Sequence, residues 1–133
     1  MTVSRRRAVA VKIHCPVSAL TFDALLNGDG DAVEHDPAAA AMLAVIRADN
    51  PLGDFKLYKG VCEISPGWES FQPGPDAEPT MGSAGERALS PTAIITTYAD
   101  ADADLAPALA ALMAAHPWEI PVIELSEVQL LER

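Results

Sequence analysis

The residues best suited to chemistry are two of the three histidines, both cysteines and one glutamate. His116 and Glu119 stand three positions apart in the segment HPWEIP, His14 precedes Cys15 directly, and Cys62 stands alone. Imidazole and carboxylate groups bind zinc or copper, and histidine exchanges protons near neutral pH. The pair His116 and Glu119 therefore indicates a divalent-metal site or an acid/base pair.

A structural interpretation of the same segment competes with the chemical one. His116 suits the C-terminal end of a helix, where the helix dipole favours it, and Pro117 suits the position that ends the helix. Trp118 then serves as a core or interface anchor. Because His116 and Glu119 supply only two of the three or four protein ligands that zinc takes, the pattern favours architecture over metal binding.

The other candidate ligands do not complete a site. Strand alternation sends His14 and Cys15 to opposite faces of one strand, so they do not share an ion easily. Cys15 and Cys62 are each typical of small buried apolar residues, and two cysteines are too few for a disulfide framework. No Ser-His-Asp or Cys-His signature is recognisable, which favours a protein without catalytic activity. The cysteine usage fits a reducing cytoplasm.

Charge and length set further bounds. The formal net charge of −10 opposes binding to nucleic-acid phosphates and to anionic lipid. No apolar run approaches the ~18 residues of a membrane span, so we expect neither nucleic acid nor membrane as a partner. A length of 133 residues is most simply one domain over residues 1–133.

The first half of the chain predicts a strand, a helix and a second strand. Apolar residues alternate over residues 8–15, which indicates a half-buried strand. Asp36 and Pro37 form an N-cap and first-turn pair ahead of a helix over residues 36–49, and residues 55–64 have the composition of a strand. Residues 16–35 remain. They are interpreted as an insertion before that helix, or else residues 18–26 are the first helix and 36–49 the addition.

The second half predicts a long loop, a strand, a helix and a last strand. Residues 65–91 are rich in proline and glycine and are therefore expected to form no regular helix or central strand. Strand character resumes over residues 92–99. The helix that follows ends at His116, and residues 120–125 form the last strand. The buried stripe of that second helix is expected to contain Leu105, Leu109, Leu112 and Met113.

The predicted order β-α-β-β-α-β is typical of an α+β ferredoxin-like sandwich, in which an antiparallel sheet carries both helices on one face. Such a sheet leaves a second face and two edges exposed. Apolar residues on both faces of the closing strand indicate that it is covered by another subunit.

Two motifs resemble the insert (YqfO-type) domain of the NGG-interacting-factor-three-like, or Nif-three, family. The run PGWESFQPGPDAEPTMGSAGE is similar to its loop of glycine, Phe-x-Pro and Pro-x-x-Gly-x-x-Gly, and HPWEIP is similar to its closing His-Pro-Tyr-Glu-Glu-Pro. The matching positions are Gly67, Phe71, Pro73, Pro79, Gly82 and Gly85 in the loop, and His116, Pro117, Glu119 and Pro121 in the closing segment. The resemblance covers residues 53–125. Three residues depart from the motifs. Trp118 replaces the tyrosine, Ile120 replaces the second glutamate, and Glu69 replaces a second glycine of the loop.

The resemblance carries several implications. The insert domain is similar to the CutA divalent-ion-tolerance proteins and, more distantly, to PII signalling proteins, so it implies a CutA-like fold and a trimer, with a dimer as the alternative. The metal site of full-length Nif-three proteins lies in flanking domains, so hydrolase chemistry would need a separate partner chain.

Two hypotheses of function follow. In the first, the chain is a non-catalytic, self-associating Nif-three insert module that binds a small ligand between subunits, with Phe71 buried under the loop. In the second, it is a CutA-like protein that binds copper or zinc through His116 and Glu119.

Overall fold

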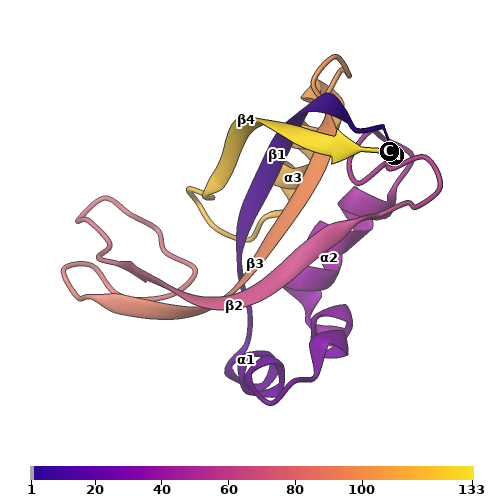
Figure 1. Cartoon of the computed structure of the whole chain (residues 1–133). Helices are drawn as coiled ribbons and strands as arrows, with labels where there is room; N and C mark the ends of the chain where they lie inside the picture. Colours follow the sequence, from indigo (N-terminus) through magenta and orange to yellow (C-terminus); the bar gives the residue numbers. More distant parts are fainter. Residues whose placement is uncertain (1) are drawn as a thin grey trace.

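The computed structural model describes residues 2–133 and shows one four-stranded sheet with helices on one side (Figure 1). The sheet is antiparallel throughout, in the order β2-β3-β1-β4. This arrangement confirms the predicted α+β ferredoxin-like class. The elements are β1 Ser4–Pro16, α1 Ala19–Leu26, the 3-10 helix η1 Gly30–His35, α2 Pro37–Arg47, β2 Cys62–Phe71, β3 Ala88–Asp100, α3 Ala106–Ala115 and β4 Ile123–Glu132.

The central strand β1 separates the two faces of the sheet as its alternation predicts. Val11, Ile13 and Cys15 are fully buried against the helices. Lys12 and His14 alternate with them and lie on the opposite face, where both are half-buried. The sheet therefore has one face sealed by helices and one face without such a cover.

The helix α2 begins where its capping residue predicts. The Asp36 carboxylate accepts hydrogen bonds from the backbone N–H groups of Ala38 and Ala39, and a third from Ser18. Pro37 occupies the first turn, where the missing N–H costs nothing. Asp36 is buried, so this one carboxylate joins α2 to the chain that leaves β1.

The helix α3 agrees with its prediction except for one side chain. Pro107 lies in its first turn, Leu112 is fully buried, and His116 is the C-cap residue. Met113, which was expected in the buried stripe, is 51% exposed. A helix turns by about 100° per residue, so the residue next to a fully buried one points well away from the sheet.

Residues 16–35 contain α1 and η1. The Ser18 hydroxyl caps α1 by accepting the Thr21 N–H, and Phe22 of α1 packs on Trp68 of β2, with ring centroids 4.6 Å apart. The segment thus adds a short helix, α1, that contacts β2 and β3 and is joined to α2 through η1 (Figure 1).

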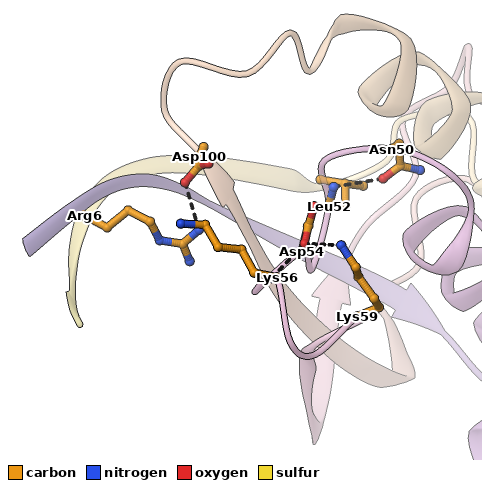
Figure 2. Close-up of polar contacts among 7 residues, drawn as sticks. All are labelled: Arg6, Asn50, Leu52, Asp54, Lys56, Lys59 and Asp100. Atoms are coloured by element: carbon orange, nitrogen blue, oxygen red, sulfur yellow. Dashed lines mark hydrogen bonds and ion pairs between the residues drawn. The ribbon is translucent and has the colours of Figure 1, made fainter. Parts of the chain in front are cut away.

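The second strand was placed too early by the sequence. β2 spans Cys62–Phe71, whereas residues 53–61 form a loop, and Figure 2 shows the polar contacts of its Asp54, Lys56 and Lys59. Lys56 and Gly53 both have positive φ, of 63° and 67°. The Asp54 carboxylate accepts hydrogen bonds from Lys56 N–H and Lys59 Nζ, at 2.9 Å and 2.6 Å. These local bonds override the strand propensity of the aromatic residues in the turn.

The prediction of a long irregular loop over residues 65–91 was also wrong at both ends. β2 continues to Phe71 through Pro66, which lies on an edge strand where proline is tolerated. Pro91 lies in β3, and its carbonyl accepts the Val17 N–H beyond the last pair of β1 with β3. In an antiparallel strand the nitrogen of Pro91 faces that same side, so no bond to β2 is lost.

No helix among residues 2–133 is long and apolar enough to cross a membrane. The longest, α2, has 11 residues, against the ~20 that a bilayer requires.

Candidate functional site

The β2–β3 loop, residues 72–87, folds back onto the connection between α3 and β4. The Glu78 N–H donates to Glu119 Oε1 at 3.1 Å, and the Thr80 hydroxyl donates to the Pro117 carbonyl at 3.0 Å. These two bonds join segments about 40 positions apart in the sequence. The two motifs that resemble the Nif-three insert domain therefore meet in space.

A cavity of about 270 Å³ lies between these two segments, and we name it the loop pocket. Its volume is just below the ~300 Å³ at which ligand pockets begin. The walls combine aromatic, apolar and acidic side chains, among them Glu69, Phe71, Pro73, Met81, Trp118 and Glu119.

Phe71 and Trp118 form the aromatic part of the pocket. Their ring centroids are 5.1 Å apart and the rings are inclined by 63°, an edge-to-face arrangement. Phe71 was expected to be buried under the loop but is half-buried, because the pocket opens beside its ring. Pro73 is the buried residue of the loop.

His116 holds the closing segment in place. The ring is buried, its Nε2 donates to the His14 carbonyl at 2.8 Å, and its Nδ1 accepts the Trp118 N–H at 3.2 Å. This pattern fixes the neutral tautomer with the proton on Nε2. Metal coordination by His116 would require one of these two bonds to break, and Glu119 already accepts a bond from Glu78.

The motif glycines divide into two groups. Gly82 has a φ of 92°, and a Cβ there would lie 3.2 Å from Ala88 Cβ and 3.5 Å from the Pro73 ring. Gly85 has a φ of 78°, and its N–H donates to the Pro73 carbonyl at 2.9 Å. Both shape the loop around the pocket. Gly67 lies apart, in β2, where a Cβ would meet the Ile94 side chain at 2.8 Å.

Neither cysteine has the character of a reactive thiol. Burial raises the pKa of the Cys15 thiol to about 12, with the nearby Asp36 carboxylate adding to the effect. Burial also raises the pKa of Cys62. Among residues 2–133, no group of three or more histidine, cysteine or acidic side chains is arranged to hold a metal ion.

Glu69 is the pocket residue that sequence reasoning missed as a functional candidate. It was noted only as a departure from the resembled motif. Its Oε1 atom is buried without a hydrogen-bond partner, and His14 Nδ1 lies 4.0 Å away. The available signal was its place two residues before Phe71, which puts both side chains on one face of β2.

Comparison with known proteins adds a likeness of fold. The sequence matches no family model and no curated protein. Its structure is similar to that of a Bacillus cereus protein related to NIF3, with a TM-score of 0.62 over 96% of this chain. The chain has a NIF3-like fold. The two proteins are 14% identical, and the chain corresponds to 29% of the length of that structure, so the likeness concerns the fold.

Proposed function

We propose that the chain is a non-catalytic, self-associating module of the Nif-three insert type, which binds a small ligand in the loop pocket between subunits. The observation that carries the proposal is the position of Ile120. This side chain lines the pocket, is 80% exposed, and stands three residues before the edge strand β4.

The edge at β4 has the properties of an unfinished interface. Val122, directly before the strand, is 42% exposed, and Leu125 and Leu131 within it are 50% and 73% exposed. An edge strand also presents unpaired backbone N–H and C=O groups, which are a template for another chain. A second copy on β4 would cover these side chains and stand beside the mouth of the loop pocket.

The resemblance to the insert domain and to CutA supports a trimer, with a dimer as the alternative assembly. A homo-oligomer in the cytoplasm is part of this proposal. The arrangement of His116 supports a structural role for HPWEIP, because both ring nitrogens are engaged with the backbone.

Light scattering of the eluted protein at several concentrations tests the proposal. The trimer predicts a mass of about 42 kDa, three times the chain's 14.0 kDa. Leu125→Lys should lower the mass, because a lysine on the interface would be desolvated. Leu57→Lys is the matched control, since Leu57 is 91% exposed in the turn before β2. A 14.0 kDa species for the unsubstituted protein at micromolar concentration would refute self-association.

A further inference from the structure

The loop pocket is acidic at opposite walls. Glu69 comes from β2, and Glu119 comes from the connection between α3 and β4, while no lysine or arginine is among the lining residues. A carboxylate in a partly enclosed cavity attracts cations more strongly than one in bulk water, because the effective dielectric constant is lower. The charge of the lining selects against phosphate, carboxylate and other anions.

One oxygen of the Glu69 carboxylate has its bonding capacity unused. Glu69 Oε1 is buried and accepts no hydrogen bond from the described residues 2–133. The nearest basic group is His14 Nδ1 at 4.0 Å, which exceeds hydrogen-bond distance. A buried acceptor without a donor is costly to the protein. Because this oxygen has almost no accessible surface, a ligand in the cavity reaches Glu69 through the other carboxylate oxygen, which is not among the buried atoms of this 20% exposed side chain. A charged N–H donor placed there would offset the charge of a carboxylate whose buried oxygen has no donor.

The remaining walls suit the rest of such a ligand. The rings of Phe71 and Trp118 meet edge to face, and an aromatic face attracts a cation placed over it. Met81 and Pro73 add apolar surface. The pocket thus offers negative charge, aromatic faces and an apolar wall within a cavity of about 270 Å³.

We propose that the loop pocket binds a small organic ammonium ion with a short apolar stem, whose N–H groups donate to Glu69 and whose charge lies against the Trp118 and Phe71 rings. This inference deepens the proposed function, because it names the class of ligand for the same pocket. Glu119 supplies the second negative charge at the mouth.

Tryptophan fluorescence provides the test. Trp68→Phe retains a ring against Phe22 and leaves Trp118 as the single reporter. Titration with n-butylammonium should give saturable binding, whereas 1-pentanol, a neutral molecule of similar length, should bind at least fivefold more weakly. Glu69→Gln keeps the size of the side chain and removes its charge, and should weaken butylammonium binding about tenfold, the effect of one charge-assisted hydrogen bond. Glu63→Gln is the control, on the same face of β2 but outside the pocket.

Three results would overturn the inference. The first is the absence of saturable binding of butylammonium up to about 10 mM, which corresponds to a binding free energy of ~2.7 kcal/mol. The others are equal binding of the alcohol and equal losses of binding in the Glu69 and Glu63 variants. Near-ultraviolet circular dichroism of each variant verifies the native fold. Light scattering on the same samples separates this inference from the proposed function. A monomer that binds butylammonium would refute only self-association, and an oligomer that does not bind it would refute only the ligand class.

Discussion

Replacing His116 with alanine distinguishes a structural His116 from a metal ligand. The substitution removes the donor to the buried end of β1, at the His14 carbonyl, and the acceptor of the Trp118 N–H. A buried polar group left without its partner costs about 1–3 kcal/mol. Two such losses sum to about 2–6 kcal/mol, which for a domain of this size lowers Tm by roughly 8–24 °C.

Thermal unfolding followed by circular dichroism measures this effect in protein prepared with a chelator. His35→Ala is the matched control, because His35 is exposed at the end of η1 and should change Tm by little. A metal ligand without a structural role predicts the opposite outcome. The account would be refuted by an unchanged Tm for His116→Ala, together with stoichiometric zinc or copper that the substitution removes from protein prepared without chelator.

Three other substitutions test a helix cap, the β2–β3 loop and the core. Asp36→Ala should cost about 2–4 kcal/mol in urea unfolding, because it removes the α2 cap and the bond to Ser18 N–H. A loss below about 0.5 kcal/mol, which is the range of ordinary surface substitutions, would contradict this. Gly82→Ala should cost about 1–2 kcal/mol, since an L-residue is strained at a φ of 92°, whereas Gly74→Ala has open space and should be nearly neutral. Equal effects of the two would count against the loop geometry. Cys15 governs part of the alkaline stability. Its folded pKa of about 12 lies above the unfolded value near 9, so its contribution is complete below about pH 9 and is lost as the pH rises through 12. The unsubstituted protein should therefore lose up to about 4 kcal/mol more than Cys15→Val over that interval, and parallel pH profiles would refute this.

The elements that sequence reasoning placed well have strong local signals. β1 alternates from Val11 to Cys15, and α2 has a capping aspartate and a first-turn proline whose geometry the structure reproduces. The end of α3 at His116 follows from the proline after it. In each case the deciding interactions lie within a few residues along the chain.

The errors at the two strand prolines and at the pocket arise where distant contacts decide. Pro66 and Pro91 read as strand breakers, yet each lies where the sheet needs no N–H from it, which depends on strand order and register. The pocket is likewise built by contacts between the β2–β3 loop and the closing segment. The motif resemblance identified both walls, but it gave no reason to single out Glu69, whose significance comes from burial beside His14.

Amide hydrogen exchange as a function of protein concentration tests the central claim most directly, namely that a second copy covers β4 beside the loop pocket. We predict that protection of β4, Ile123–Glu132, and of residues 117–122 rises together as concentration increases, while the other edge strand, β2, stays unchanged. Protection that is independent of concentration, or that rises along β2 alone, would contradict the account.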